Sequence, residues 1–268
     1  MMLSLASAFG SHAATKDSGI TVISYNIRQG ICQDGTNSWD FRAPANMEMF
    51  KEQSPDILCL QEPLDIQMKF IKYFYDDYKG IGVGSRDGKK DGEISEILYN
   101  SKTMSLAQWG TFWLSGTPDK PSAGWDADSC RTATWAFMKD KKSGNRVLVV
   151  NAHLDSSSED CRIKSIDLIK SKIAEINKDS VPVILTGSFN MTPDNPALKS
   201  LGMTDTRKSA VKTDANGTFN NWGKSKSVIY DYIFTKGLGC TEFETIVKPY
   251  GKRTFISDHF PIKAKLLF

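Results

Sequence analysis

The chain has 268 residues, of which 40% are hydrophobic and 24% are charged, as is ordinary for a globular protein. Its 34 basic and 31 acidic residues leave a formal net charge of only +3. This near balance disfavours a duplex-DNA binder with a broad cationic face, although it permits a local basic cleft. The length fits a single large α/β or two-sheet domain, and no linker, charge block or internal repeat divides the chain.

The first 14 residues (MMLSLASAFGSHAA) join a short apolar stretch to small residues, as in the later part of a secretory signal. A basic region before the apolar stretch is missing, so a flexible tail is the alternative, and residues 10–12 also fit a cloning scar. We assign residues 1–19 to a signal-peptide remnant or tail and residues 20–268 to one domain. We expect an exported, periplasmic or extracellular monomer without a membrane span, because no other segment has the roughly 18 uninterrupted apolar residues that a span requires.

Apolar periodicity then predicts strands with intervening helices in both halves of the chain. The predicted strands are residues 20–27, 56–60, 80–84, 93–99, 109–114, 132–139, 146–151, 181–186, 228–234, 240–247 and 261–267. The predicted helices are residues 43–53, 64–74 and 161–177. This alternation predicts an α/β fold in which helices pack on sheets.

The five cysteines form no Cys-x-x-Cys pair, which argues against a structural zinc site. Cys59 lies within a predicted strand and is most simply a buried small hydrophobe. Cys130 and Cys161 each precede an arginine in a polar stretch. In an exported protein we expect these two to form a disulfide that joins loops near the cleft.

Several apolar stretches end in polar residues, and side chains at such strand ends commonly line a site. In chain order the stretches are SYN at 24–26, DILCLQE at 56–62, NAHLD at 151–155, VILTGSFN at 183–190, DYIF at 231–234 and ISDHFPI at 256–262. They bring carboxylates, amides and two of the three histidines of the chain into candidate positions.

These stretches, in this order, resemble the endonuclease/exonuclease/phosphatase superfamily, whose members cleave phosphoester bonds with a divalent metal. The resemblance runs from about residue 21 to residue 267. It implies a DNase I-like α/β fold, which is a four-layer sandwich of two packed mixed β-sheets flanked by helices, with the catalytic residues at one end. One position departs from the pattern: the family has Gly-Asp-Phe-Asn, and here Ser188 stands where the family has its aspartate.

The resemblance assigns the metal ligands. It makes Glu62 the principal ligand, with Asn26 as its close companion and Asp258 as a further ligand. Carboxylate and amide oxygens suit Mg²⁺ or Mn²⁺, which prefer oxygen ligands and keep several waters. Taken alone, a glutamate that ends a strand is more often a solvated cap or an ion-pair partner.

The resemblance also assigns the catalytic residues. It makes His259 the histidine that contacts phosphate and Asp231 the carboxylate that orients it, which would fix the tautomer and raise the pKa of the ring. His153 supports the site from within, although a purely structural histidine fits equally well. Asn190 stabilises the developing transition state. The aspartate replaced by Ser188 orients or deprotonates the attacking water, a role that a serine hydroxyl cannot fill as a base near neutral pH.

Four more residues match positions in secreted bacterial-type members of the superfamily and are candidates for substrate binding: Arg86, Glu93, Arg131 and Arg162. The planar guanidinium suits phosphate, and Glu93 could hold an arginine by ion pairing. Solvated loop charges are the alternative for each of them.

Three functions stay open at this stage. The first is a metal-dependent phosphoesterase for a nucleic-acid, nucleotide or other phosphodiester substrate, with chemistry impaired by Ser188. The second is a non-catalytic protein that binds a phosphorylated ligand in the same cleft. The third is a phosphatase or phospholipase-type enzyme acting on small or lipid phosphoesters.

Overall fold

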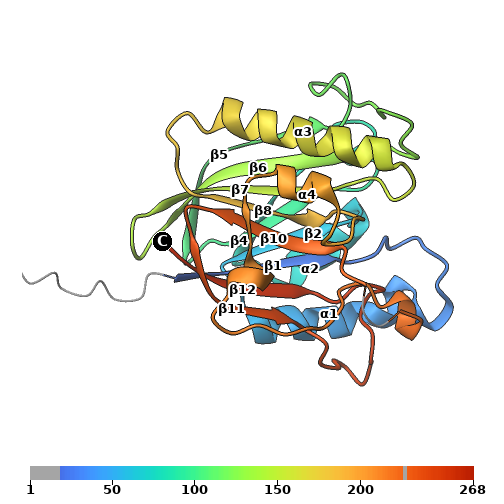
Figure 1. Cartoon of the computed structure of the whole chain (residues 1–268). Coiled ribbons are helices and arrows are strands. Elements are labelled where there is room, and N and C mark those ends of the chain that lie inside the picture. Colours follow the sequence, from blue (N-terminus) through green and yellow to red (C-terminus); the bar gives the residue numbers. More distant parts are fainter. Residues whose placement is uncertain (1–18, 226–227) are drawn as a thin grey trace, which may run out of the picture.

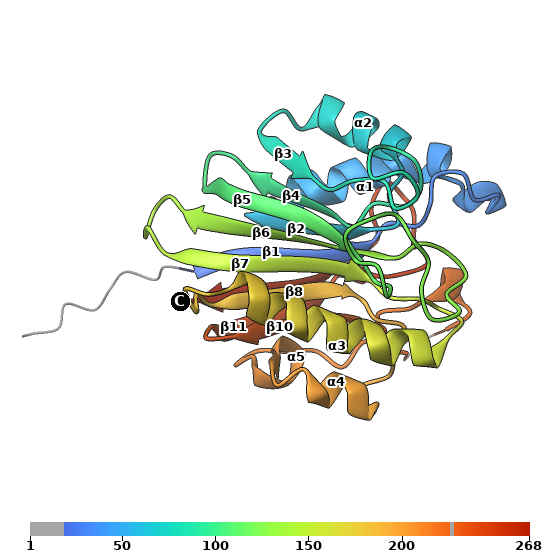
Figure 2. The ribbon, with the colours of Figure 1, turned by 90° about the horizontal axis from the view of Figure 1, so that it is seen from above.

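A computed structural model describes residues 19–225 and 228–268. Two six-stranded sheets pack face to face, with helices on both outer surfaces (Figures 1 and 2). The predicted tail, residues 1–19, falls outside the described residues except for Gly19, which opens the first strand. The architecture confirms the predicted four-layer α/β sandwich.

The first sheet contains both ends of the described chain. Its strands are β1 (Gly19–Asn26), β2 (Ile57–Gln61), β3 (Tyr78–Ile81), β4 (Glu96–Asn100), β11 (Gly239–Thr245) and β12 (Ile262–Leu267). They follow the order β11-β12-β1-β2-β4-β3. The β1–β2 pair is parallel and the others are antiparallel, so the sheet is mixed.

The second sheet is built from the middle of the chain. Its strands are β5 (Met104–Trp113), β6 (Thr132–Asp140), β7 (Arg146–His153), β8 (Val183–Ser188), β9 (Thr204–Asp205) and β10 (Asp231–Lys236). They follow the order β5-β6-β7-β8-β10-β9, with β7–β8 as the parallel pair. Each sheet therefore has one parallel pair at its centre, whose two strands end at the same edge.

Helices cover the outer faces. They are α1 (Trp39–Gln53), α2 (Asp65–Phe74), α3 (Glu159–Ile176), α4 (Pro196–Ser200) and α5 (Thr206–Ser209), with short 3₁₀ turns η1 (Gly35–Asn37) and η2 (Asn221–Gly223). Figure 2 shows α1 and α2 on one side and α3 and α4 on the other. Buried side chains of α1 and α2 pack on the first sheet, and those of α3 pack on the second. No helix of residues 19–225 and 228–268 has the length and apolarity to cross a membrane.

The space between the sheets changes from apolar to polar along the strands. Its apolar part is a buried cluster that includes Val22, Ile57, Val149, Ile184, Ile233 and Ala264. A belt of buried amides follows: Gln61 Nε2 donates to Ser24 Oγ at 3.1 Å and to Asn151 Oδ1 at 2.7 Å. Beyond this belt the strands end in the candidate site residues, so polar groups are concentrated at one end of the sandwich.

Some predicted bounds need correction. The strand predicted at 228–234 begins at Asp231, because Thr218 Oγ1 binds the amides of Tyr230 and Asp231 at 3.0 and 3.1 Å and holds the chain before it. The strand predicted at 93–99 begins at Glu96. The first helix begins at Trp39, four residues before the predicted start, and it contains Pro44, a residue that favours helix starts.

The predicted disulfide is absent, because all five cysteines are free thiols. Cys161 lies in the first turn of α3 and is fully buried, with Sγ 3.9 Å from Ser165 Oγ. Cys130 is half-buried in the loop before β6. The polar pattern around Cys161 suggested an exposed loop, but this residue belongs to a helix whose inner face is covered.

Candidate active site

Three neighbouring strands of the second sheet place three polar residues in a row. The register pairs His153 of β7 with Ser188 of β8, and Ser188 with Asp231 of β10. Residues paired directly across strands project to the same face of a sheet. Because Val149, Ile184 and Ile233 of the same strands belong to the cluster between the sheets, the row also faces the first sheet.

The first sheet supplies Asn26 and Glu62 on the opposite side. They lie together because β1 and β2 are parallel and end at the same edge. Asn26 Nδ2 donates to Glu62 Oε1 at 2.8 Å, and the backbone amide of Gln29 donates to Glu62 Oε2 at 3.2 Å. Glu62 has a φ of 68°, a left-handed conformation that is uncommon for a residue with a side chain.

His259 and Asp231 form a buried pair, with His259 Nδ1 2.8 Å from Asp231 Oδ2. Burial alone would lower the pKa of His259, but the carboxylates of Asp231, Asp258 and Glu62 outweigh that effect and raise it to about 9. The ring is therefore a cation near neutral pH, and its Nε2–H, which has no partner among the described residues, can meet a negative oxygen in the cavity.

His153 forms a second pair, with Glu93. Its Nδ1 lies 2.9 Å from Glu93 Oε2, and Arg131 Nη1 donates to the same oxygen at 3.0 Å. Arg131 Nε also donates to Asp155 Oδ2 at 3.2 Å. Burial would raise the pKa of Glu93, but His153 and Arg131 hold it at about 2, so this side chain stays an anion. Glu93 thus orients both Arg131, an ion pair of the kind expected from the sequence, and His153, a contact that was not expected.

A cavity of about 570 Å³ opens at this end of the sandwich. Its lining residues are Asn26, Arg28, Gln29, Asp34, Glu62, Glu93, Arg131, His153, Ser156, Asn190, Phe219, Asn221, Trp222, Tyr230, Asp258 and His259. Ser188 and Asp231 are buried and do not line it. Eight of these lining residues were not singled out from the sequence, chiefly because they lie in loops without periodicity.

Two of the predicted substrate-binding arginines do not line the cavity. Arg86 is 61% exposed and lies 3.7 Å from Asp91, and Arg162 donates to the carbonyl oxygens of Asp155 and Ser156. The cavity is instead lined by Arg28, which pairs with Asp34 at 3.1 Å.

Two buried polar atoms beneath the cavity have no hydrogen-bond partner among the described residues: Ser188 Oγ and Asp231 Oδ1. Buried polar atoms are rarely left unpaired. Because the two residues are direct partners across β8 and β10, both atoms belong to the same row. A longer polar side chain at position 188 would therefore enter surroundings that are already polar.

The donor set fits a hydrated, oxygen-liganded cation. Within residues 19–225 and 228–268, no three His, Cys, Asp or Glu side chains form a closed metal cage. Mg²⁺ needs only one or two carboxylates and keeps its remaining waters. Glu62 and Asp258 supply two carboxylates that line the cavity with the Asn26 amide, which matches Mg²⁺ or Mn²⁺ and not a structural zinc site.

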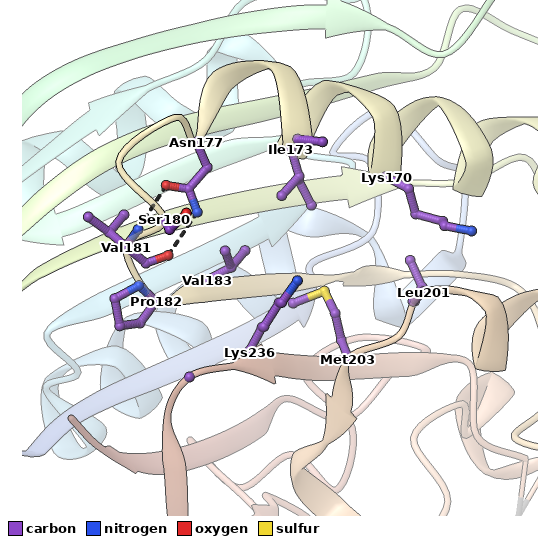
Figure 3. A pocket seen from close by; sticks show the side chains of 12 residues that line it. Lys170, Ile173, Asn177, Ser180, Val181, Pro182, Val183, Leu201, Met203 and Lys236 are labelled. Carbon is purple, nitrogen blue, oxygen red and sulfur yellow. Dashed lines mark hydrogen bonds between the residues drawn. The ribbon is translucent and has the colours of Figure 1, made fainter.

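A second hollow, of about 620 Å³, lies at the other end of β8 (Figure 3). It is bordered by the last turns of α3 and by residues 180–183, where Asn177 bonds both the amide and the carbonyl of Val181. Its lining contains Lys170 and Lys236 but no histidine or carboxylate among the described residues. This hollow lacks the histidine and carboxylate groups that phosphoester hydrolysis requires. The cavity around Glu62 and His259 is therefore the candidate active site.

The fold and this cavity together define a two-sheet α/β protein with histidines and carboxylates at one end. Residues 23–259 match the model of the Endonuclease/Exonuclease/phosphatase family, and the chain belongs to that family. An endonuclease/exonuclease/phosphatase from Bacteroides vulgatus is 32% identical, with a TM-score of 0.87 over 94% of this chain and 100% of that one.

Two further relatives show the range of the family. A mannosyl-6-phosphatase of Bacteroides thetaiotaomicron is 32% identical, with a TM-score of 0.88 over 93% of this chain and 100% of that one. The exoribonuclease subunit Ccr4 of the CCR4-Not complex of Emericella nidulans is 27% identical over 63% of this chain, but the match spans only 29% of Ccr4. The family therefore contains both phosphatases and nucleases.

Proposed function

We propose that this chain is a divalent-metal-dependent phosphoester hydrolase whose turnover is impaired by Ser188. The row His153, Ser188 and Asp231 carries the proposal, because Ser188 occupies its centre between two histidine–carboxylate pairs. By family resemblance this is the place of an aspartate that orients or deprotonates water. A serine hydroxyl cannot serve as that base near neutral pH.

Glu62, Asn26 and Asp258 would hold Mg²⁺ or Mn²⁺. When bound, the cation neutralises phosphate oxygens and stabilises a leaving oxygen. The Asn26–Glu62 hydrogen bond keeps one carboxylate oxygen in place before the cation arrives. Arg28, 3.6 Å from Asp258, limits the repulsion between the two carboxylates.

His259 binds the phosphate from the other side. With Nδ1 bound to Asp231, its cationic ring presents Nε2–H to a phosphate oxygen. Asn190 adds an amide: its Nδ2 donates to the Leu154 carbonyl at 2.9 Å, which leaves Oδ1 for the cavity that Asn190 lines. These groups bind and orient a phosphoester without needing Ser188.

The test is hydrolysis of p-nitrophenyl phosphate, a monoester, and of bis-p-nitrophenyl phosphate, a diester, in Mg²⁺ or Mn²⁺ by the chain and by Ser188→Asp. We expect slow hydrolysis that depends on the metal and a clear gain in the variant. If neither protein hydrolyses either ester while both bind inorganic phosphate, the chain is a binding protein for a phosphorylated ligand. Ser188 favours this second function over hydrolysis, because it leaves the phosphate-binding groups in place without a base.

The charges of the cavity favour a small substrate. Its lining contains four carboxylates, and its two arginines, Arg28 and Arg131, are already paired with carboxylates. Nucleic-acid backbones are bound by extended basic grooves. The similarity to a mannosyl-6-phosphatase supports a phosphate monoester, and the similarity to Ccr4 keeps a nuclease as the alternative. Comparing mannose 6-phosphate with single-stranded RNA as substrates of Ser188→Asp separates them.

A further inference from the structure

One wall of the cavity is aromatic. Phe219, Trp222 and Tyr230 line it together with His259, and we call these three residues the aromatic wall. The Phe219 ring lies 4.9 Å from the His259 ring and 5.5 Å from the Tyr230 ring. All three wall residues are only partly buried, so their rings are accessible to a ligand in the cavity. The wall begins directly beside the histidine that would bind phosphate.

Trp222 is held in an unfavourable backbone conformation. It has φ 55° and ψ 38°, and Asn221 before it has φ 45°, so two successive residues with side chains adopt the left-handed region. Such conformations persist only where the surrounding structure enforces them, and they are concentrated at functional sites. A tryptophan in this position therefore needs a reason beyond the turn itself.

The buried side chain of Asn220 enforces the conformation. Its Oδ1 accepts from the Trp222 amide at 2.9 Å, and its Nδ2 donates to the Ser257 carbonyl at 3.1 Å. The backbone amides of Asn220 and Asn221 both donate to the Asp258 carbonyl, at 2.8 and 3.0 Å. The turn is thus bonded to the segment that carries Asp258 and His259, which fixes Trp222 relative to the phosphate-binding end of the cavity.

The position of the wall limits what it can contact. Because Phe219 touches His259 itself, the wall meets the group joined most directly to a bound phosphate. A pyranose phosphorylated on its exocyclic carbon places a flat C–H face there. A nucleoside 5′-phosphate places its ribose there and its base farther away, and an acyclic ester offers no flat face. Aromatic rings bind such faces by dispersion and by removing apolar surface from water.

We propose that the aromatic wall, with Trp222 as its principal contact, selects a phosphorylated sugar ring of the hexose 6-phosphate kind as the substrate. This inference rests on the proposed function, since it requires phosphate to bind beside His259. The exposed amide of Asn221, which lines the cavity in the same turn, supplies a hydrogen-bonding group for sugar hydroxyls.

Calorimetric binding in Mg²⁺, with Ser188 in place so that ligands are consumed slowly, tests the inference. The probes are inorganic phosphate, mannose 6-phosphate, glycerol 3-phosphate and adenosine 5′-monophosphate. We expect mannose 6-phosphate to bind about 10-fold more tightly than glycerol 3-phosphate, as one good ring contact provides. Trp222→Ala should bring this ratio close to 1, and Trp222→Phe should keep most of it.

A second variant separates recognition from folding. Trp222→Gly removes the indole and also relaxes the left-handed backbone, so its melting temperature should equal or exceed that of the parent while the ratio is lost. The matched control is Trp109→Ala, which removes a 40% exposed tryptophan of β5 that does not line the cavity. It should leave the ratio unchanged.

The remaining outcomes are decisive in different ways. Phosphate binding with an unchanged ratio in both Trp222→Ala and Trp222→Gly would overturn the wall as the selecting surface. Tighter binding of adenosine 5′-monophosphate than of mannose 6-phosphate, lost in Trp222→Gly, would replace the sugar by a nucleobase. No binding of inorganic phosphate to the parent chain would overturn the proposed function, and this inference with it.

Discussion

His259 and His153 lie on opposite sides of Ser188, and each turns Nδ1 toward a carboxylate, Asp231 at 2.8 Å and Glu93 at 2.9 Å. The carboxylates differ in their other partners. Asp231 uses one oxygen for His259 and leaves the other unpaired among the described residues, whereas Glu93 also accepts from Arg131 and Gln29. Asp231 thus depends on a cationic His259 for its charge balance, while Glu93 is neutralised by Arg131 as well.

The difference suggests a division of work between the two pairs. The Asp231–His259 pair presents a cation to the cavity, because the pKa of His259 is raised to about 9. The Glu93–His153 pair is part of a network with Arg131 and Asp155 that keeps the His153 and Arg131 side chains in a fixed orientation. Between the two lies Ser188, which adds neither charge nor a base.

The largest expected effect comes from placing a carboxylate between the pairs. Ser188→Asp should raise kcat by roughly 10²–10⁴-fold on p-nitrophenyl phosphate or bis-p-nitrophenyl phosphate, whichever the chain hydrolyses, because it restores a base or orienting group for water. Ser188→Asn has nearly the same shape but no base, and it should give no comparable gain. The gain should also vanish in the double variant with His259→Ala.

If Ser188→Asp folds, binds phosphate and shows no gain, the water-activating group lies elsewhere. A gain of equal size in Ser188→Asn would mean that polarity at position 188, and not basicity, was missing. Either result would contradict the view that Ser188 lacks a catalytic group while the histidine–carboxylate pairs on both sides of it are complete. Initial rates at saturating substrate and metal provide the measurement.

The next effect concerns the pH dependence of stability. The pKa of His259 is about 9 in the folded chain against 6.5 ordinarily, so its contribution is full below pH 6.5 and is lost as pH rises through 9. The displacement corresponds to about 3 kcal/mol. Asp231→Asn, which removes the main cause of the displacement, should therefore destabilise the chain by up to this amount at pH 6 and far less at pH 10.

Glu93→Gln provides the contrasting variant. The pKa of Glu93 is lowered from 4.5 to about 2, so its contribution is full above pH 4.5 and is lost only as pH falls toward 2. Its cost should change much less between pH 6 and pH 10 than that of Asp231→Asn, because Arg131 stays charged at both pH values and keeps its ion pair with Glu93. Urea unfolding without divalent metal at both pH values measures the two costs. Equal costs for Asp231→Asn at pH 6 and pH 10 would contradict the assigned charge of His259.

Local patterns predicted the strands and the main helices, whereas the two-sheet sandwich and the site positions of His153, Ser188 and Asp231 were predicted from the family resemblance. Strand-end motifs place His153, Ser188 and Asp231 at the ends of apolar stretches, and the order of the motifs matches one family. The pairing of His153 with Glu93 was not predictable from these patterns, since Glu93 lies 60 residues away in a segment without regular structure before β4.

The aromatic wall and Arg28 were missed for the same physical reason. Phe219 and Trp222 lie in a segment whose conformation is set by hydrogen bonds to Ser257 and Asp258, almost 40 residues later. Arg28 follows β1 in a left-handed conformation with φ 62°. Neither apolar periodicity nor a helix signal reports such tertiary contacts, and Arg86 and Arg162 were overvalued because charge alone does not place a side chain.

A smaller effect tests whether Glu62 acts as a metal ligand or as a partner of His153. Its Oε1 lies 3.8 Å from His153 Nε2, and it also lines the cavity with Asp258. If Glu62 is a metal ligand, Mg²⁺ at 100 times its Kd should stabilise the chain by about 2.7 kcal/mol, and Glu62→Gln should abolish this gain. Thermal melts with and without Mg²⁺ measure it, with Glu175→Gln on the surface of α3 as the matched control.

The opposite pattern would assign Glu62 to the His153 pair. In that case Glu62→Gln would lower the melting temperature without metal and keep the full Mg²⁺ response. Such a result would give His153 two carboxylate partners, Glu93 and Glu62. It would make the His153 side of Ser188 more like the His259 side. It would also remove Glu62 from the proposed metal ligands.

The smallest expected effect, a null one, concerns what holds the His153 side together. Cys130 precedes Arg131, and Cys161 lies in the helix that follows Asp155, so a disulfide between them would brace that network covalently. With free thiols, the network rests on hydrogen bonds and ion pairs alone, and a reductant should leave the melting temperature unchanged.

Native alkylation should modify the half-buried Cys32 and Cys130. Cys59, Cys161 and Cys240 should react only after unfolding, because burial raises the pKa of each thiol, to about 12 for Cys59 and about 11 for Cys240. A Cys130–Cys161 peptide in non-reduced maps, together with a lower melting temperature in reductant, would show that the His153 side is covalently braced and the His259 side is not.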